Sequence, residues 1–184
     1  MLKDIKEVFF SKEEIQGMVS RIGKQISEDY KDKNLLLVCV LKGSVCFMSD
    51  LMKEITIPCK IDFMEAKSYG AATVTSGVVN ISKDIVYDIS DYDILLIEDI
   101  FDSGRTLEKL TQILSHRNPK SVACCSLLDK PERRAEGVKL ELKYTGAQVP
   151  DAFVVGYGLD YDEYYRNLPF IGVLKPEVYT EIKE

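Results

Sequence analysis

The stretch ILLIEDIFDSGRT, residues 94–106, decides the fold and suggests a binding site. Four apolar residues lead into the acidic pair Glu98–Asp99. Two more apolar residues follow, and then a turn of aspartate, serine, glycine, arginine and threonine. A Gly/Ser/Thr turn after a hydrophobic strand is typical of a loop that binds phosphate. Three carboxylates in the same stretch would repel phosphate, so they need a separate explanation.

The turn Asp102–Thr106 offers successive backbone N–H groups at the predicted start of a helix, together with two hydroxyls. Gly104 permits close approach, so the turn can form a nest for an anion. The alternative is a plain connection in which Ser103 or Thr106 caps the helix, and the spacing is not that of a Walker A loop. The preceding carboxylates can accept hydrogen bonds from sugar hydroxyls or hold Mg²⁺ through water. The stretch therefore suits a phosphorylated sugar.

Further apolar runs surround this stretch and alternate with patterns of helical spacing. The predicted strands are Leu35–Leu41, Ile94–Ile97, Val122–Leu128 and Phe153–Val155. The predicted helices are Ser11–Tyr30, which opens with a Ser11/Glu14 capping box, Val45–Ile55 and Thr106–Leu114. This alternation predicts an α/β fold with a mainly parallel central sheet flanked by helices. The length of 184 residues favours a single domain, residues 1–184.

Polar residues follow each of the four predicted strands. They are Lys42–Gly43–Ser44, Glu98–Asp99, Asp129–Lys130 and, after a short interval, Asp160. Ligands of open α/β sheets bind beyond the carboxyl ends of the strands. Any one of these ends could be merely solvated, but four at one edge of one sheet predict a site there.

Two segments between the first two buried strands indicate a hairpin. Pro58–Tyr69 has the pattern of a strand, with Ile61 and Phe63 alternating with polar neighbours. Tyr69–Ser82 is small, polar and β-branched, which suggests a mobile hairpin or lid.

Composition excludes several classes of protein. The net charge of −6 and the pI near 5.0 disfavour nucleic-acid binding. The single histidine, His116, argues against a His-based triad or a multi-His metal site, and we interpret it as a helix-end residue. The five cysteines lack metal spacing and indicate reduced, buried thiols; they are Cys39, Cys46, Cys59, Cys124 and Cys125. No apolar run is long enough to cross a membrane, and the charged start does not resemble a signal peptide, so we expect a cytoplasmic protein.

The stretch LLIEDIFDSGRTL resembles the phosphoribosyl-pyrophosphate signature of the type I phosphoribosyltransferases. The motifs LKGS (41–44), KSYG (67–70), LLDK (127–130) and FVVGYGLDYDEYYRNLPFIGVL (153–174) resemble the hypoxanthine-guanine branch of that family. This resemblance implies the type I fold with a small hood and a mobile lid hairpin. It also implies purine salvage, in which 5-phosphoribosyl passes from 5-phosphoribosyl 1-pyrophosphate to hypoxanthine or guanine and gives the nucleotide plus pyrophosphate. A homo-oligomer, dimer or tetramer, is expected as well.

The resemblance further implies roles for particular residues. Asp102 would be the general base that faces purine N7, and Mg²⁺ would be the cofactor, with Glu98, Asp99 and Asp160 as the carboxylates on its side. Glu98 and Asp99 would also lie near the ribose hydroxyls, and Lys130 would donate to the purine O6. Pyrophosphate would be bound by the backbone of Lys42 and Gly43, which a cis peptide precedes, and by Arg166. The 5-phosphate would be bound by the turn of Ser103, Gly104, Arg105 and Thr106. Phe153 and Val154 would contact the base, and Ser68 and Tyr69 would lie at the tip of the lid.

Several alternatives remain open at this point. The base could be xanthine or a pyrimidine, although a pyrimidine fits Lys130 and the Phe153 segment poorly. The chain could be an RNA-binding regulator built on the same fold, since fold does not fix function, but its acidic balance disfavours this. It could also be a catalytically silent binding module, and the intact acidic set speaks against that.

Overall fold

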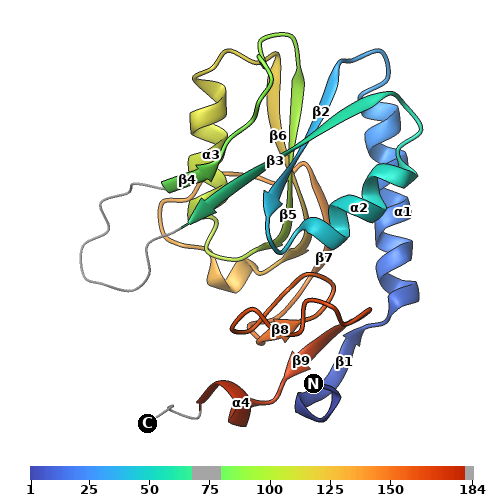
Figure 1. Ribbon diagram of the computed structural model, residues 1–184, viewed down its shortest axis with the longest axis vertical. Helices are drawn as coiled ribbons and strands as arrows, with labels where there is room; N and C mark the ends of the chain where they lie inside the picture. The colour runs from blue at the N-terminus through green and yellow to red at the C-terminus, as the bar shows by residue number, and fades with distance from the viewer. Residues whose placement is uncertain (68–79, 181–184) are drawn as a thin grey trace.

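Parallel pairing of apolar strands builds the centre of the molecule (Figure 1). The computed structural model describes residues 1–67 and 80–180. Its six-stranded sheet has the order β4-β3-β2-β5-β6-β7. Strands β2, β3, β5, β6 and β7 pair in parallel, and β4 pairs antiparallel with β3. Their bounds are β2 Leu35–Leu41, β3 Cys59–Lys67, β4 Asn80–Lys83, β5 Asp93–Phe101, β6 Ser121–Asp129 and β7 Tyr144–Gln148. The predicted α/β class is confirmed.

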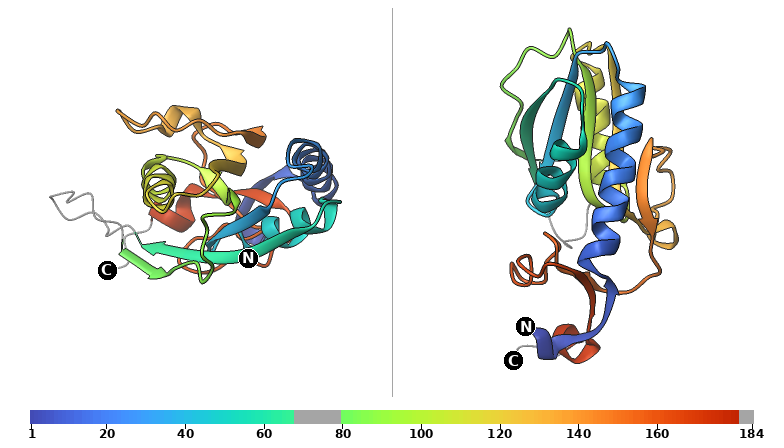
Figure 2. Two further views of the ribbon diagram at one scale, coloured as in Figure 1. Left: turned by 90° about the horizontal axis from the view of Figure 1, so that it is seen from above. Right: turned by 90° about the vertical axis from the view of Figure 1, so that its right-hand side faces the viewer.

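Helices cover both faces of this sheet (Figure 2, left). The helices α1 (Lys12–Asp29) and α2 (Val45–Glu54) pack on one face, and α3 (Arg105–Ser115) packs on the other. Ser11 caps α1 by accepting from the N–H of Glu14, whose side chain accepts from the N–H of Ser11 in return. The predicted capping box is therefore present, and all three predicted helices lie within one or two residues of their expected bounds.

A second, three-stranded sheet lies below the first, next to both termini (Figure 1). It is antiparallel with the order β1-β9-β8. Its strands are β1 Ile5–Phe10, β8 Val154–Val155 and β9 Ile171–Leu174. The 3-10 helices Leu2–Asp4 and Pro131–Arg133 and the helix α4, Pro176–Thr180, complete the described part of the chain.

The expectation that Phe153–Val155 ends at the same sheet edge as the other strands is wrong. This segment pairs with β9, with Val154 opposite Val173, and therefore belongs to the small sheet. A two-residue strand carries too little pattern to reveal its partner. The polar residues Asp151 and Asp160, on either side of this segment, still line one cavity with residues of the main sheet. They do so because the small sheet lies across from the carboxyl ends of β5 and β6 (Figures 1 and 2).

The predicted strand is present as β3, and its two faces pack against different core clusters, with Phe63 in contact with one and Met64 in the other. Ile61 is 37% exposed, whereas Asp62 and Met64 are buried. The buried Asp62 is satisfied by the ammonium of Lys83 at 3.1 Å and the N–H of Val86 at 2.9 Å. Ile61 therefore lies toward solvent, whereas Phe63, on the same side of the strand, is partly buried against the core. Of the expected lid Tyr69–Ser82, residues 69–79 lie outside the described residues.

The other sequence expectations concern the cysteines, His116 and membrane segments. All five cysteines are free, and Cys39, Cys124 and Cys125 are buried. Burial raises the pKa of Cys39 to about 11, so this thiol stays protonated. His116 ends α3, as expected. Within residues 1–67 and 80–180, we find no helix that is both long and apolar enough to span a membrane.

Candidate active site

The turn after β5 presents a helix N-terminus to the edge of the main sheet. Gly104 is the N-cap residue of α3 and has φ 80°, in the left-handed region that glycine tolerates. A Cβ at this position would lie 2.9 Å from the ring of Phe101. Within residues 1–67 and 80–180, no side chain caps α3, so the alternative of a Ser103 or Thr106 cap is not formed. The first N–H groups of α3 are therefore left for a ligand, and the helix dipole favours an anion there.

Two partly buried carboxylates, Glu98 and Asp99, lie near the end of β5. Burial, together with the neighbouring Asp99, raises the pKa of Glu98 well above its ordinary value. Burial also raises the pKa of Asp99 to about 6; Arg166 acts in the opposite direction and Asp160 in the same direction. Among the described residues, Oε2 of Glu98 is buried without a hydrogen-bond partner. A buried, unpaired acid is costly, so this pair is suited to hydroxyl donors or a cation.

The turn between β2 and α2 packs directly against Asp99. The Leu41–Lys42 peptide is cis, as the resemblance implied. A Cβ built at Gly43 would overlap Oδ2 of Asp99, and one built at Gly158 would overlap the carbonyl oxygen of Gly43. Only glycine fits at these two close approaches. The turn therefore brings the backbone around Lys42 next to the acidic strand end.

An ion-pair network extends from this turn. The ammonium of Lys42 lies 2.9 Å from Oε2 of Glu163, and Arg166 approaches the same carboxylate at 3.4 Å. Arg166 also pairs with Asp160 at 2.9 Å and donates to the carbonyl oxygen of Gly158 at 2.8 Å. Among the described residues, Nε of Arg166 is buried without a partner. The side chain of Lys42 and Arg166, the expected side-chain contact of pyrophosphate, thus share the carboxylate of Glu163.

Lys130 is a buried lysine at the end of β6. It is 8% exposed, and its backbone N–H donates to the carbonyl oxygen of Phe101 at 3.0 Å. Its side chain lines a cavity, and within the described part of the chain no group accepts a hydrogen bond from its ammonium. The ammonium is therefore free to donate to a ligand.

Phe153 lines the same cavity as Lys130 and belongs to a cluster of aromatic rings. Its ring is 37% exposed, stacks on Tyr179 of α4 with centroids 4.9 Å apart, and meets Tyr161 edge-on at 5.5 Å. Val154 is buried beside it. Sequence reasoning missed Tyr179, and an aromatic residue in a short C-terminal helix gives no periodic signal that would have found it.

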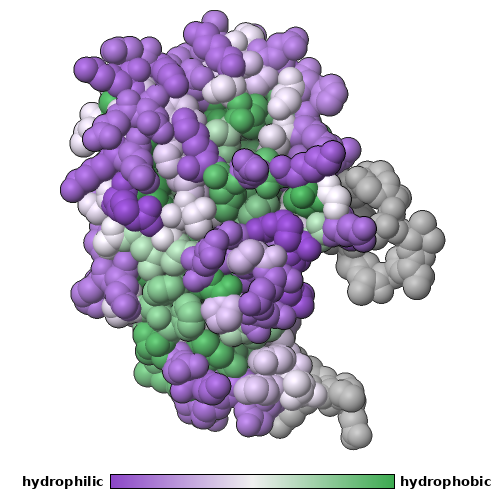
Figure 3. All heavy atoms as spheres, turned by 180° about the vertical axis from the view of Figure 1, so that it is seen from behind, coloured by the Kyte–Doolittle hydropathy of each residue, from purple (hydrophilic) through white to green (hydrophobic). Residues whose placement is uncertain are grey.

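A cavity of about 500 Å³ joins these elements between the two sheets, where the surface is hollowed (Figure 3). It combines carboxylates, cations and aromatic rings. Its lining includes the expected residues Asp99, Asp102, Lys130, Phe153, Val154 and Asp160, and also Arg133, Asp151 and Tyr179, which the sequence had not suggested.

The other expected residues lie around this cavity. Glu98 lies in β5 next to Asp99, and Ser103, Gly104, Arg105 and Thr106 form the turn and the start of α3. Lys42, Gly43 and Arg166 form the adjoining cluster described above. Ser68 and Tyr69 lie outside the described residues. Arg133 reaches Oδ1 of Asp102 at 3.4 Å, a contact hidden in the charged run of residues 132–134.

Comparisons with known proteins agree with this architecture. The family model of the phosphoribosyl transferase domain matches residues 11–162. The hypoxanthine-guanine phosphoribosyltransferase of Staphylococcus epidermidis is 50% identical over 181 residues, covering 98% of this chain and 100% of that protein. Its counterpart in Staphylococcus aureus is 49% identical over 180 residues, covering 98% and 99%. Neither a xanthine-specific enzyme nor an RNA-binding regulator is favoured by these relatives.

Solved structures give the same result. A crystal structure of a hypoxanthine phosphoribosyltransferase from Staphylococcus aureus has a TM-score of 0.93 and 49% identity, covering 98% of this chain and 97% of that one. A hypoxanthine-guanine phosphoribosyltransferase from Bacillus anthracis, with a HEPES molecule in its active site, has a TM-score of 0.86 and 42% identity, covering 94% and 98%. The chain therefore belongs to the phosphoribosyltransferase family, among the hypoxanthine-guanine phosphoribosyltransferases.

Proposed function

We propose that this enzyme acts in purine salvage and transfers 5-phosphoribosyl from 5-phosphoribosyl 1-pyrophosphate to hypoxanthine or guanine. The observation that carries the proposal is the arrangement of one cavity. A buried lysine donor and an aromatic ring, Lys130 and Phe153, lie at its base-binding side, and the uncapped start of α3 follows directly from Asp102 on its wall. A 6-oxopurine and a sugar phosphate match these two chemistries.

The 5-phosphate would be held by the turn that contains Ser103, Gly104, Arg105 and Thr106. The open N–H groups of α3 supply the donors, and the left-handed conformation of Gly104 starts the helix at this turn. The ribose hydroxyls would donate to Glu98 and Asp99, whose burial makes a partner valuable. In this arrangement Glu98 and Asp99 would bind the sugar, and the turn of residues 103–106 would bind the phosphate.

The purine would stack on Phe153 and donate or accept along its edge. Lys130 carries only donors, so it fits the carbonyl O6 of hypoxanthine and guanine and meets the amino group of adenine donor to donor. Tyr179, already stacked on Phe153, extends the aromatic surface of the cavity. Val154 would support the base from the backbone side.

Asp102 would act as the general base at N7 of the purine. It lines the same cavity as Lys130 and Phe153, and its side chain is 42% exposed. Departure of pyrophosphate from C1 leaves positive charge on the sugar, which nearby carboxylates stabilise. As N9 of the purine bonds to C1, the carboxylate of Asp102 would accept the proton that N7 releases. Most of the acceleration would come from positioning and fixed charge.

The donor set suits Mg²⁺. Carboxylates are the ligands that Mg²⁺ prefers, and the ion usually keeps several waters and substrate oxygens. Within the described residues, no group of three or more ligating side chains could hold a metal alone, which fits an ion bound mainly by the donor substrate. Asp99, Asp160 and the unpaired oxygen of Glu98 would hold it, directly or through water. Bound there, the ion would neutralise the leaving pyrophosphate.

Pyrophosphate would bind to the backbone near Lys42 and Gly43 and to Arg166. In the ligand-free protein Glu163 pairs with both cations. The donor's pyrophosphate would therefore replace one carboxylate as their partner. The residues Ser68 and Tyr69 remain expected contacts at the lid.

We also propose a homo-oligomer, dimer or tetramer, and a cytoplasmic location. Large apolar side chains are exposed near the small sheet, among them Leu2 at 69% and Val8 at 54%, and the surface there is markedly apolar (Figure 3). Exposed apolar clusters often mark interfaces. Sedimentation of the purified protein measures the assembly, and a monomer at all concentrations would contradict it.

A direct assay tests the proposed reaction. The protein is incubated with 5-phosphoribosyl 1-pyrophosphate, Mg²⁺ and either hypoxanthine or guanine, and the nucleotide and pyrophosphate are quantified. We expect both products in equal amounts, no product in excess EDTA, and recovery when Mg²⁺ is added back. Full turnover in chelator would contradict the metal assignment, and absence of nucleotide with both bases would contradict the function.

A further inference from the structure

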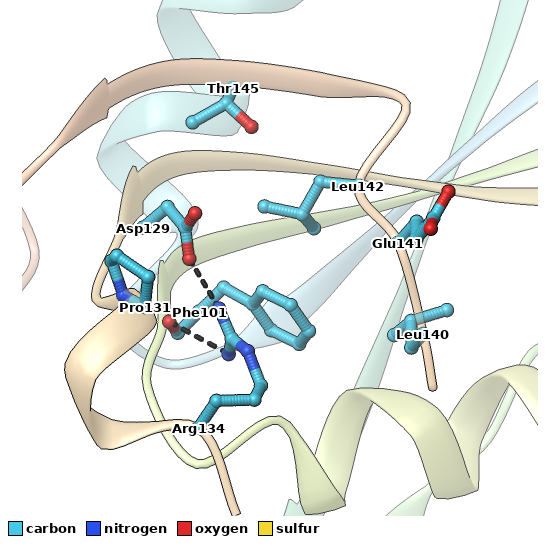
Figure 4. A pocket seen from close by; sticks show the side chains of 8 residues that line it. All are labelled: Phe101, Asp129, Pro131, Arg134, Leu140, Glu141, Leu142 and Thr145. Carbon is cyan, nitrogen blue, oxygen red and sulfur yellow. Dashed lines mark hydrogen bonds and ion pairs between the residues drawn. The ribbon is translucent and has the colours of Figure 1, made fainter. Parts of the chain in front are cut away.

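We propose that Arg134 is a positioning residue for the reaction, which holds the backbone of Asp102 and Lys130 from behind the active site. Its guanidinium donates to the carbonyl oxygens of Phe101, at 3.1 Å, and of Asp102. It also pairs with the carboxylate of Asp129. Its plane lies over the ring of Phe101, 3.3 Å from the ring centroid (Figure 4). One side chain thus joins the ends of β5 and β6.

The contacts of Arg134 connect the two segments that carry Asp102 and Lys130 in the substrate cavity. The carbonyl oxygen of Phe101 accepts from Arg134 and also from the backbone N–H of Lys130, at 3.0 Å. The next residue along, Ala135, donates its N–H to the carbonyl oxygen of Ser103 at 3.0 Å. The segment that carries the base-binding lysine is therefore bonded to the turn that carries the general base.

The ring of Phe101 also connects Arg134 to the turn Asp102–Thr106, because it contacts Arg134 and lies next to Gly104. The ring is buried, 3% exposed, with Arg134 on one face. It lies so close to Gly104 that a Cβ there would be 2.9 Å away. A shift of the Arg134–Phe101 stack would therefore move the left-handed residue that starts α3.

Arg134 acts through other groups and not on the substrate. It lines a separate cavity of about 420 Å³, bordered by Asp129, Leu140 and Leu142 (Figure 4). Asp102 and Lys130 line the substrate cavity, and Arg134 does not. Its contribution is the placement of two backbone segments, which differs from the direct contacts of the neighbouring Arg133.

The fork of the guanidinium is essential to this role. Two carbonyl oxygens, a carboxylate and a ring face are satisfied at once, whereas a lysine ammonium is a single compact charge that cannot stack in the same way. We therefore expect Arg134→Lys and Arg134→Ala to lower kcat on the order of 10- to 100-fold, as a displacement of about 1 Å can do. The KM of the donor should change much less, because the N–H groups of α3 remain.

Chemical rescue tests the proposal, which rests on the proposed function for its kinetic arm. The open cavity behind the strand ends gives guanidinium access to the position vacated in Arg134→Ala. Millimolar guanidinium chloride should restore part of kcat, and methylammonium chloride at equal ionic strength should not. Arg117→Ala is the matched control, because Arg117 also forms a fork with a carboxylate, that of Asp84 at 2.8 and 2.7 Å, near the opposite ends of the strands. It should keep wild-type kcat and show no rescue.

A second readout does not depend on turnover. The amide N–H groups of Lys130 and Ala135 donate to the carbonyl oxygens of Phe101 and Ser103. Their hydrogen exchange should be faster in Arg134→Ala than in wild type and should slow again with guanidinium, whereas it should not change in Arg117→Ala. Wild-type kcat in Arg134→Ala, equal rescue by both cations, or unchanged exchange would overturn the proposal. If Arg134→Ala does not fold, Arg134→Lys decides by the same kcat and exchange measurements. If the wild-type protein transfers to no purine, the proposed function fails, and the exchange result alone judges Arg134.

Discussion

The carboxylate of Asp99 lies directly against Gly43, so close that a Cβ at Gly43 would overlap its Oδ2 atom. This contact joins the acidic end of β5 to the turn that follows the cis Leu41–Lys42 peptide. The placement of the carboxylate and the conformation of the turn are therefore a single structural unit. Any side chain at Gly43 must displace one or the other.

Gly43→Ala should lower kcat/KM for the donor by roughly 10²-fold, since displacement of a positioned group by about 1 Å can have that effect. Gly17→Ala is the matched control. Gly17 lies inside α1, and a Cβ added there would meet nothing within 4 Å, so alanine should raise the free energy of unfolding by about 0.5–1 kcal/mol and leave kinetics unchanged. Steady-state kinetics on both variants check this, and normal kinetics in Gly43→Ala would contradict the close contact.

Activity should depend on the ionisation of Asp99. Burial raises its pKa to about 6, so below this pH the carboxyl is protonated and cannot serve a cation. We expect kcat/KM for the donor to fall as the pH drops through about 6, and Asp99→Asn to be weak at every pH without this dependence. A pH profile of both proteins provides the measurement. An unaltered low-pH limb in Asp99→Asn would assign the titration elsewhere.

The same pKa shift affects stability with a definite sign. Between the ordinary carboxyl pKa of 3.8 and about 6, the folded state binds more protons at Asp99 than the unfolded state does. The free energy of unfolding of the ligand-free protein should therefore receive a contribution that decreases as pH rises through this window. Glu98, whose pKa is also raised, contributes with the same sign. Denaturant titrations at several pH values measure the slope, which Asp99→Asn should reduce.

Much of the fold follows from local patterns in the sequence. The apolar run Leu35–Leu41 and the capping box of Ser11 and Glu14 depend on neighbouring residues alone, and both occur as expected. The small sheet could not be predicted, because β1 pairs with β9 across more than 160 residues, with Ile5 opposite Leu174. No local pattern encodes such a partner, and so the placement of Phe153–Val155 was also missed.

Some residues of the candidate site could likewise be predicted from local sequence patterns, and others could not. Glu98, Asp99 and Asp102 stand out because acids follow a buried strand, and Asp99 and Asp102 do line one cavity. Arg134 could not be found, because a charged run after a strand is usually solvated surface. Only the folded structure brings it over Phe101 and next to Asp129.

Asp102→Asn should slow the chemical step while leaving donor binding nearly intact. Asparagine keeps the shape of the turn and its backbone donors, and the carbonyl that Arg134 contacts is unchanged. Positioned acid–base groups contribute about 10²–10⁴-fold, so the single-turnover rate should fall by that order. Donor affinity is measured separately by titration. A single-turnover rate equal to wild type would leave Asp102 as a turn residue only.

Glu163→Gln should strengthen pyrophosphate binding. The carboxylate of Glu163 pairs with Lys42 at 2.9 Å and with Arg166 at 3.4 Å, so it competes with pyrophosphate for both cations. Because Glu163 and Lys42 are exposed, at 63% and 55%, each pair is worth at most about 1 kcal/mol, and the gain from losing both should be less than about 30-fold. Product inhibition by pyrophosphate measures it, and high salt should reduce the difference. Weaker inhibition in the variant would contradict the competition.

The choice of base by Lys130 is the central claim, and one competition measurement tests it most directly. The wild-type enzyme, 5-phosphoribosyl 1-pyrophosphate and Mg²⁺ are supplied with equal hypoxanthine and adenine, and the two nucleotides are quantified. Opposed donors at a buried lysine cost about 1–3 kcal/mol, so the kcat/KM for hypoxanthine should exceed that for adenine by roughly 5- to 150-fold. Comparable amounts of the two nucleotides would contradict the assignment of Lys130 to the purine O6.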